Sequence, residues 1–279
     1  MVIIDGKKTA QEIRQELKQQ VKGLREQGNE CGLAVIIVGE DPASKVYVKN
    51  KVLACEEIGI TSYHYELSEN TTEETLIALI NDLNQNNNVH GILVQLPLPK
   101  HLNERKILGC IDPKKDVDGF SSYQMGKLLL GEDCFPSCTP YGVMELLKRY
   151  NIDVAGKKAV IVGRSNTVGK PMALMLLKEN ATVTICHSKT DDLKKHTLEA
   201  DILVVAIGRG RFVTEDMVKD GATVIDVGMN RIDGKLCGDV DYEKVKDKCA
   251  FITPVPGGVG PMTVTMLMKN TVEAALKNG

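Results

Sequence analysis

The residues best suited to chemistry in the first half of the chain lie on one side of a predicted helix that follows Asp41. At about 100° per residue, Lys51 shares an arc with Tyr47 and apolar residues, whereas Lys45 and Lys49 lie on the other side. A lysine withdrawn from water there could act as a general acid or base near neutral pH. The alternative is a lysine whose ammonium group reaches solvent along its aliphatic stem. The arc holds Ser44, Tyr47, Val48, Lys51, Cys55 and Ile58.

Two further polar residues are expected near Lys51. Gln95 ends an otherwise apolar strand, and the helix that carries Lys51 leaves the same edge of the predicted sheet. Ligands gather at the carboxyl ends of parallel strands, so Gln95 and Lys51 can meet there. Asp118 lies in the run Lys115-Asp-Val-Asp-Gly119, at a predicted junction between domains where clefts form. Taken alone, an acid in such a run is more often a solvated loop residue.

A second stretch whose residues could bind a ligand runs from residue 157 to residue 178. Its apolar strand, 159–162, leads into Gly163-x-Ser165-x-x-Val168-Gly169, a dinucleotide fingerprint in which serine replaces the second glycine. A strand, a glycine turn and a helix start together form an anion site, because free backbone N–H groups and the helix dipole converge there. An ordinary strand-to-helix turn that needs its glycines only for geometry is the alternative.

The residues after the next strand bear on the choice of cofactor. The strand 182–186 runs into His187-Ser188-Lys189, and the first acid is Asp191. An acid directly after this strand favours NAD, whereas a hydroxyl and a cation suit a 2′-phosphate, as does Arg164. The sequence therefore predicts NADP, with a solvated loop around Lys189 as the alternative.

Short apolar strands alternate with helical segments along the whole chain. The first half predicts helices over 8–27, from 42 onward and over 72–83, with strands over 33–38, 60–67 and 91–96. The second half predicts strands over 159–162, 182–186, 202–206, 223–227 and 250–252. This alternation predicts an α/β fold with parallel sheets and two domains. Residues 114–133 are expected to cross between the domains, and a helix over 262–276 to dock back onto the first domain. The domains are accordingly 1–137 joined by 262–279, and 138–261.

Composition excludes several classes of protein. The 279 residues are 43% hydrophobic and 4% aromatic with a formal net charge of −2, which argues against a nucleic-acid surface. The N-terminus turns polar too soon for a signal peptide, and no apolar run reaches the roughly 20 residues of a membrane helix. The eight cysteines are scattered without metal-ligand spacing, which predicts reduced thiols in a cytoplasmic protein and no metal.

One more segment has an unusual composition near the C-terminus. The run Pro254-Val-Pro-Gly257-Gly258-Val-Gly260-Pro261-Met-Thr263 combines a backbone made rigid by prolines, a glycine cluster and a predicted helix start. Its backbone could approach a ligand closely because glycines carry no Cβ.

Seven motifs follow one another in order along essentially the whole chain. Two are the runs Lys115–Gly119 and Pro254–Thr263, and the others are Ser44-x-x-Tyr47-x-x-x-Lys51, Val94-Gln-Leu-Pro-Leu98, Cys138-Thr-Pro140, Val162-Gly-Arg-Ser165 and His187-Ser-Lys189. Together they resemble the bifunctional methylenetetrahydrofolate dehydrogenase/methenyltetrahydrofolate cyclohydrolase family. The runs Lys115–Gly119 and Pro254–Thr263 are highly specific, whereas the glycine turn is not.

The resemblance implies a homodimer whose chains have an N-terminal α/β folate domain and a Rossmann-like NADP domain, with a folate cleft between them. It implies oxidation of 5,10-methylene-tetrahydrofolate by NADP, followed by hydrolysis of the methenyl cation to 10-formyl-tetrahydrofolate. No metal, nucleic acid or membrane is expected as a partner.

The resemblance also implies roles for individual residues. Lys51 would be the general acid and base, with Tyr47 assisting and stacking on the folate and Gln95 tuning the lysine. Asp118 would hold the pterin ring. The other expected contacts are those of Gly163, Arg164, Ser165 and Ser188 with the cofactor phosphates, Met229 with the nicotinamide side, and Pro256, Gly257 and Gly258 with the substrate beside it.

Two other functions are compatible with this architecture. An NADP-dependent dehydrogenase of a small hydroxy acid, similar to shikimate dehydrogenase, would turn over that acid and leave folate untouched. A non-catalytic nucleotide-sensing module would bind NADP without changing the absorbance of a folate substrate.

Overall fold

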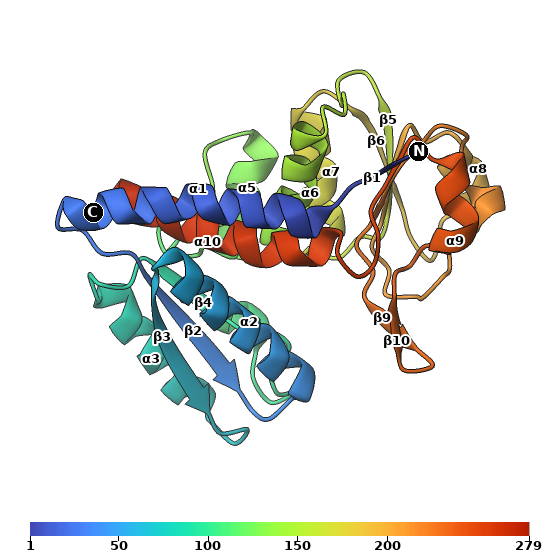
Figure 1. Ribbon diagram of the computed structural model, residues 1–279. Helices are drawn as coiled ribbons and strands as arrows, with labels where there is room; N and C mark the ends of the chain where they lie inside the picture. The colour runs from blue at the N-terminus through green and yellow to red at the C-terminus, as the bar shows by residue number, and fades with distance from the viewer. Residues whose placement is uncertain (279) are drawn as a thin grey trace. The chain divides into compact units, whose positions relative to one another are not determined.

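The computed structural model describes residues 1–278, which form two compact units (Figure 1). The six-stranded unit comprises residues 1–11 and 137–263, and the three-stranded unit comprises residues 12–136 and the chain from Val264 onward. All neighbouring strands of the two main sheets are parallel. The predicted two-domain α/β class with parallel sheets is confirmed, while the functional domains 1–137 with 262–279 and 138–261 remain a prediction.

The three-stranded unit is built on the strand order β3-β2-β4. Its central strand β2 (Gly32–Val38) is buried along its whole length, as the continuous apolar run predicts, and it pairs with β3 (Thr61–Leu67) and β4 (Gly91–Val94). Alternate β2 residues, including Ile36, pack with α3 (Glu73–Gln85) and α4 (Glu104–Leu108). Ile37 points the other way, toward α2 (Pro42–Ile58), which packs along β2 and β3 (Figure 1).

Helix α2 begins and ends where its sequence dictates. The Asp41 carboxylate accepts a hydrogen bond from Ser44 N at 2.7 Å, Pro42 occupies the first turn, and Gly59 ends the helix with φ of 94°. Aspartate caps free N–H groups, and glycine adopts the left-handed conformation without a Cβ clash. The apolar side of the helix is therefore fixed against the sheet, with Val48, Cys55 and Ile58 buried.

Two long helices start in one unit and end in the other. Helix α1 (Gly6–Glu26) buries the stripe predicted from its sequence, and α10 (Val259–Asn278) starts three residues before the predicted helix. Within the three-stranded unit, α10 packs against α2 and the start of β2, since Met268 Sδ lies 3.5 Å from Cys55 Sγ and the Thr271 carbonyl accepts from Cys31 Sγ at 3.7 Å.

The six-stranded unit has the strand order β1-β11-β8-β7-β5-β6. Its strands are β1 (Val2–Ile3), β5 (Lys158–Val162), β6 (Thr182–Cys186), β7 (Ile202–Val205), β8 (Thr223–Asp226) and β11 (Phe251–Ile252). The successive strands β6 and β7 lie on opposite sides of β5, so the strand order reverses at β5. Doubly wound sheets bind nucleotides at the carboxyl end of the strands at such a switch point. The helical segments are α6 (Cys138–Arg149), α7 (Gly169–Lys178), α8 (Leu193–Leu198), η1 (Glu215–Met217), α9 (Tyr242–Val245) and η2 (Lys246–Lys248).

The structure also contains elements that the sequence did not predict. The first residues form β1, because Val2 N and Ile4 N donate to the carbonyls of Ala250 and Ile252. A hairpin of β9 (Asn230–Ile232) and β10 (Lys235–Cys237) follows β8. The segment 114–133, expected only as a crossing, contains α5 (Ser122–Leu130), which Ser121 caps by accepting from Gln124 N at 3.3 Å.

Candidate active site

Lys51 lies where its helical arc predicts, on the buried side of α2. Only 8% of the residue is exposed, and its ammonium nitrogen donates to Gln95 Oε1 at 2.9 Å. Gln95 follows β4 and is itself held by a bond of 2.7 Å from Nε2 to the Leu96 carbonyl. The amide is thus oriented with its oxygen toward the lysine. The sequence correctly predicts that Lys51 and Gln95 meet, and the solvent-reaching alternative for Lys51 is wrong.

Tyr47 stands one turn before Lys51 and is 40% exposed. Partial burial raises the pKa of its hydroxyl, so the phenol remains a neutral hydrogen-bond donor at neutral pH. A half-exposed ring beside a buried lysine can offer an apolar face to a flat ligand. The geometry agrees with the predicted place of Tyr47, and its contact with folate remains a prediction.

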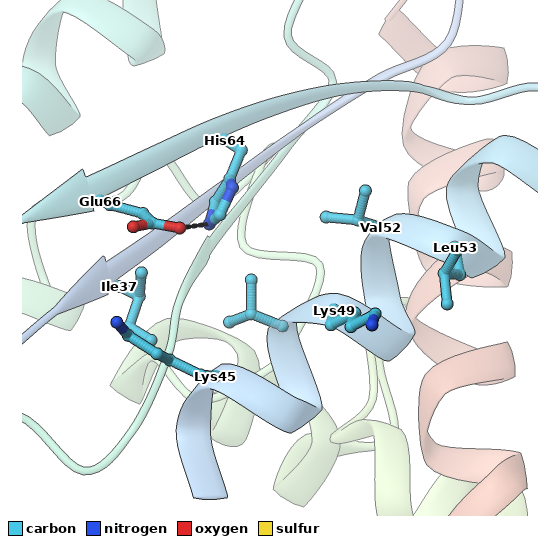
Figure 2. A pocket seen from close by; sticks show the side chains of 8 residues that line it. Ile37, Lys45, Lys49, Val52, Leu53, His64 and Glu66 are labelled. Atoms are coloured by element: carbon cyan, nitrogen blue, oxygen red, sulfur yellow. Dashed lines mark ion pairs between the residues drawn. The ribbon is translucent and has the colours of Figure 1, made fainter. Parts of the chain in front are cut away.

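The other flank of α2 carries the lysines that the sequence assigns to solvent. Lys45 and Lys49 border a pocket of about 290 Å³ between α2 and β3, which Figure 2 shows. In this pocket His64 Nε2 lies 3.7 Å from Glu66 Oε1, while the Lys45 ammonium pairs with Glu40. Lys51 and Gln95 are not among the lining residues, so this pocket is separate from the predicted site. Its lining is completed by Ile37, Val48, Val52 and Leu53.

The loop that presents Asp118 is organised by its neighbours in the same motif. Asp116 is 2% exposed, and its carboxylate accepts hydrogen bonds from the backbone of Gly119 at 3.1 Å and Ser121 at 2.9 Å. Burial raises the pKa of Asp116, and these bonds oppose the shift. The Lys115 ammonium donates to the carbonyls at the end of α3, and burial lowers its pKa. Lys115 and Asp116 therefore fix the backbone on either side of Asp118.

Asn270 of α10 is a further support for this loop, and sequence patterns missed it. Its side-chain amide is fully buried and donates to the Val117 carbonyl at 2.8 Å and to the Pro136 carbonyl at 3.1 Å. A polar residue in the apolar stripe of a helix was the only signal that could have found it. Gly91 of β4 leaves the room that Val117 fills, because a Cβ at Gly91 would lie 2.7 Å from Val117 Cγ2.

The glycine turn after β5 is a tight passage of the backbone. Gly163 has φ of 132°, and a Cβ there would collide with the Ala206 carbonyl, while a Cβ at Gly169 would collide with the Gly163 carbonyl. Ser165 Oγ accepts from the backbone N–H groups of Val168 at 3.1 Å and Gly169 at 3.3 Å, and so fixes the turn that leads into α7. The Ser165 hydroxyl proton remains available as a donor. Arg164 and Ser165 are exposed.

The turn after β6 is also stabilised by its own side chains. His187 N donates to Thr190 Oγ1 at 2.8 Å, and Lys189 N donates to His187 Nδ1 at 3.1 Å. These bonds leave Ser188 and Lys189 exposed at the tip of the turn. β5 and β6 are adjacent parallel strands, so this turn and the glycine turn lie at the same edge of the sheet. A hydroxyl and cations at that edge fit the phosphates of a dinucleotide.

The glycine cluster at the start of α10 is likewise a site of close backbone approach. A Cβ at Gly258 would lie 2.5 Å from the Pro254 carbonyl, and a Cβ at Gly260 would lie 3.2 Å from Met229 Cε. Gly257 has φ of 104°, and its carbonyl accepts from Lys7 N at 2.9 Å. Met229, 47% exposed, therefore stands against the cluster, as expected of two parts of one site.

Among residues 1–278, no group of three or more histidine, cysteine, aspartate or glutamate side chains could hold a metal ion. Over the same residues, every helix is too short or too polar to cross a bilayer.

Comparisons with known proteins decide the family. The model for the catalytic domain of tetrahydrofolate dehydrogenase/cyclohydrolase matches residues 4–118, and the model for its NAD(P)-binding domain matches residues 137–279. The chain belongs to the tetrahydrofolate dehydrogenase/cyclohydrolase family. It is 61% identical to the bifunctional protein FolD of Lachnoclostridium phytofermentans, over 99% of this chain and 98% of that protein.

Solved structures agree with this assignment. The chain has a TM-score of 0.98 and 54% identity to the bifunctional FolD of Campylobacter jejuni, with 99% of both chains covered. It has a TM-score of 0.95 and 38% identity to the FolD of Trypanosoma brucei, a structure that contains NADP and an inhibitor, with 99% and 98% covered. The family confirms the predicted bifunctional folate enzyme and its predicted NADP-type cofactor domain.

The hydroxy-acid alternative shares only the architecture. Shikimate 5-dehydrogenase from Thermus thermophilus has a TM-score of 0.54 and 16% identity, over 88% of this chain and 100% of that one. At that identity the likeness concerns the fold alone, so the folate function is favoured.

Proposed function

We propose that this enzyme oxidises 5,10-methylene-tetrahydrofolate with NADP and hydrolyses the methenyl product to 10-formyl-tetrahydrofolate, with Lys51 as the proton-transfer residue. The observation that carries this proposal is the buried Lys51 ammonium bonded to Gln95 Oε1 at 2.9 Å, within the stretch that matches the family's catalytic domain. A buried lysine with an oriented partner is arranged for proton transfer rather than for surface solvation.

In the oxidation, the protein mainly positions the reactants. Bound NADP would supply the acceptor for the hydride that leaves the methylene carbon of the folate. The carbon lies between two nitrogens, which stabilise the cation left behind, so the side chains need to align more than to activate. Asp118 would accept paired N–H donors of the pterin ring, and Tyr47 would cover the ring face. The loop bonds of Lys115 and Asp116 keep Asp118 in place for this contact.

In the hydrolysis, protons must move. Water adds to the methenyl carbon and loses a proton, and the carbon–nitrogen bond that opens the ring breaks as that nitrogen gains a proton. Lys51 can donate to the departing nitrogen and recover a proton from the attacking water. Gln95 Oε1 accepts from the Lys51 ammonium and so holds the nitrogen in one direction while the proton is transferred.

The residues around the carboxyl end of β5 fit NADP. Gly163 and Gly169 allow the close backbone passage that the dinucleotide turn needs, and Arg164 and Ser188 are exposed beside it. A guanidinium and a hydroxyl can bind a 2′-phosphate. Arg164→Ala should therefore raise the KM for NADP and leave that for NAD nearly unchanged, as measured by initial rates with both cofactors. An equal loss with NADP and NAD would show that Arg164 does not bind the 2′-phosphate.

The proposed activity is tested by following the methenyl absorbance. The purified chain is mixed with 5,10-methylene-tetrahydrofolate and NADP, with parallel reactions containing NAD or shikimate. Methenyl absorbance should rise and then decay to 10-formyl product with NADP, and shikimate should not be oxidised. Binding of NADP without any absorbance change would instead identify a nucleotide-sensing module.

The enzyme is further proposed to be a cytoplasmic homodimer. The eight cysteines are free thiols, which suits a reducing compartment. In the described chain β6 pairs only with β5, and Leu177 and Ile185 beside this sheet edge are 57% and 40% exposed. Open edges are usually covered, so a second copy is expected there. Sedimentation velocity should give twice the mass of one chain, and Ile185→Lys should shift it toward the monomer.

A further inference from the structure

Two buried acids in the six-stranded unit are not used by the chemistry above. Asp226 is the last residue of β8 and Asp239 follows β10; their exposed fractions are 3% and 0%. Burying a carboxylate costs folding free energy unless its oxygens accept hydrogen bonds. Two such residues therefore require a structural or functional explanation.

Asp239 gathers donors from two separate loops. Its Oδ2 accepts from the backbone N–H groups of Ile207 at 2.7 Å and Gly208 at 3.0 Å. Its Oδ1 accepts from the backbone of Arg209 at 2.7 Å and from Asn230 Nδ2 at 2.8 Å. Three consecutive backbone N–H groups thus point at one carboxylate, an anion-binding arrangement filled by the protein's own side chain. One side chain therefore fixes the loop after β7 and the residue next to Met229.

Asp226 in turn holds Asp239. Its Oδ1 accepts from the backbone of Gly228 and of Asp239, each at 2.9 Å, and its Oδ2 accepts from Val240 N at 2.9 Å. A Cβ at Gly228 would collide with the Asp239 carboxylate, and a Cβ at Gly238 with the Asp226 carboxylate. The two acids and the glycines around them therefore form one closely packed unit.

The loops fixed by this pair lie where the cofactor is expected. Residues 207–209 and 227–230 follow β7 and β8 at their carboxyl ends, on the edge of the sheet where doubly wound folds bind dinucleotides. The Ala206 carbonyl, directly before the first loop, is the group that leaves no space for a Cβ at Gly163. Met229, in the second loop, stands against Gly260.

We propose that Asp239, held by Asp226, is a positioning residue for the nicotinamide half of the cofactor site. It acts by fixing the loop 207–209 and, through Asn230, the backbone of Met229. The inference deepens the proposed function and rests on it, because it assigns these loops to NADP. It predicts that Asp239 matters to the oxidation and to NADP affinity, while the hydrolysis, which uses Lys51 and Gln95 of the three-stranded unit, needs it little.

The test replaces one acceptor oxygen without changing the shape of the side chain. In Asp239→Asn, an NH₂ group replaces one of the two carboxylate oxygens, and an NH₂ group cannot accept hydrogen bonds. Each oxygen accepts two bonds in the wild type, so two of the four are lost whichever way the amide is oriented. The Kd for NADP should rise. The kcat of the oxidation should fall by about 10²-fold, the loss expected when the reactants are misplaced by about 1 Å. The hydrolysis of added methenyl-tetrahydrofolate should stay within about threefold of wild type. Asn230→Ala, which removes one donor only, should show the same pattern more weakly.

Leu203→Ala in β7 is the matched control, since it opens a cavity in the core of the same sheet and Leu203 takes no part in the hydrogen bonds of the pair. It should lower the melting temperature and leave the ratio of oxidation to hydrolysis unchanged. Equal fractional loss of both activities in Asp239→Asn and Asn230→Ala, or unchanged NADP affinity in both, would overturn the inference. A wild-type enzyme without NADP-dependent oxidation would instead overturn the proposed function.

Discussion

Lys51 and Lys49 are two residues apart on α2 and differ in their surroundings. Lys51 is buried and donates to Gln95, whereas Lys49 is exposed on the flank that borders the pocket with His64. Two positions along the helix, about 200° of rotation, therefore separate a proton-transfer candidate from a surface lysine of the same chemistry. The pair provides a sharp internal comparison for the mechanism.

Lys51→Met should abolish the hydrolysis while retaining part of the oxidation, because only the hydrolysis requires proton transfer at the reacting atoms. The expected loss is about 10²–10⁴-fold, the usual contribution of general acid–base catalysis. Methenyl-tetrahydrofolate should then accumulate, which its absorbance reports directly. Lys49→Met is the control and should leave both rates nearly unchanged. Hydrolysis by Lys51→Met at the wild-type rate would remove Lys51 from the mechanism.

Asp118 is predicted to orient the pterin through charge-assisted hydrogen bonds. Asp118→Asn keeps the shape of the side chain and loses its charge, so both activities should fall together. The expected cost is roughly 1.5–3 kcal/mol, as for other bonds to a charged group. Steady-state kinetics of the two reactions and direct measurement of folate affinity would check this. Folate binding that equals that of wild type would contradict the assignment.

At the scale of elements, local rules predicted the helices and strands that carry the site. Asp41, Pro42 and Gly59 mark the ends of α2, and the period of 3.6 residues places Lys51 on its buried side. Those signals lie within one short segment, so the sequence contains them directly. The meeting of Lys51 with Gln95 followed from a rule about strand ends rather than from either residue alone.

The elements that sequence patterns missed depend on contacts between distant residues. β1 has two residues and exists because β11, about 250 positions later, pairs with it. Asn270 supports the Asp118 loop across 153 positions, and the donors of Asp239 lie up to 32 positions away. No local pattern specifies such partners, since the side chain is chosen for a neighbour that only the fold brings near.

The bonds between α10 and the Asp118 loop can be tested at this scale. Asn270→Ala takes this donor away from the buried Val117 carbonyl and the partly buried Pro136 carbonyl, which should cost roughly 1–3 kcal/mol of folding free energy. The KM for folate should also rise, because Val117 precedes Asp118. Urea unfolding and steady-state kinetics provide the two measurements. Asn81→Ala, on the exposed side of α3, is the control. If the Asn270→Ala enzyme had the same stability and the same KM as the Asn81→Ala enzyme, the bonds of Asn270 would be unimportant.

At the scale of the whole molecule, the residues proposed for the two reactions fall in different units. Lys51, Gln95 and Asp118 belong to the three-stranded unit, and Gly163, Ser188 and Met229 belong to the six-stranded unit. Each unit also has a buried acid that fixes a loop proposed for substrate or cofactor binding, Asp116 in one and Asp239 in the other. Buried acids that organise loops link the stability of the enzyme to pH.

Asp226 should make the folding free energy depend on pH in a defined direction. Burial, and the nearby Asp239 charge, raise its pKa from 3.8 to about 7. Between these values the folded chain binds a proton that the unfolded chain releases. The stability that Asp226 contributes is therefore full below pH 3.8 and is lost as the pH rises through 7, by up to about 1.4 kcal/mol per pH unit.

The comparison with Asp226→Asn isolates this effect, because the amide does not titrate. In urea unfolding from pH 5 to pH 8, the stability of wild type relative to Asp226→Asn should fall up to about pH 7 and then level off. Asp201→Asn is the control: the Lys219 ammonium lowers the pKa of Asp201 below 3.8, so its difference from wild type should be constant over that range. A constant difference for Asp226→Asn as well would mean that Asp226 is ionised throughout. Its three backbone donors would then outweigh the cost of burial.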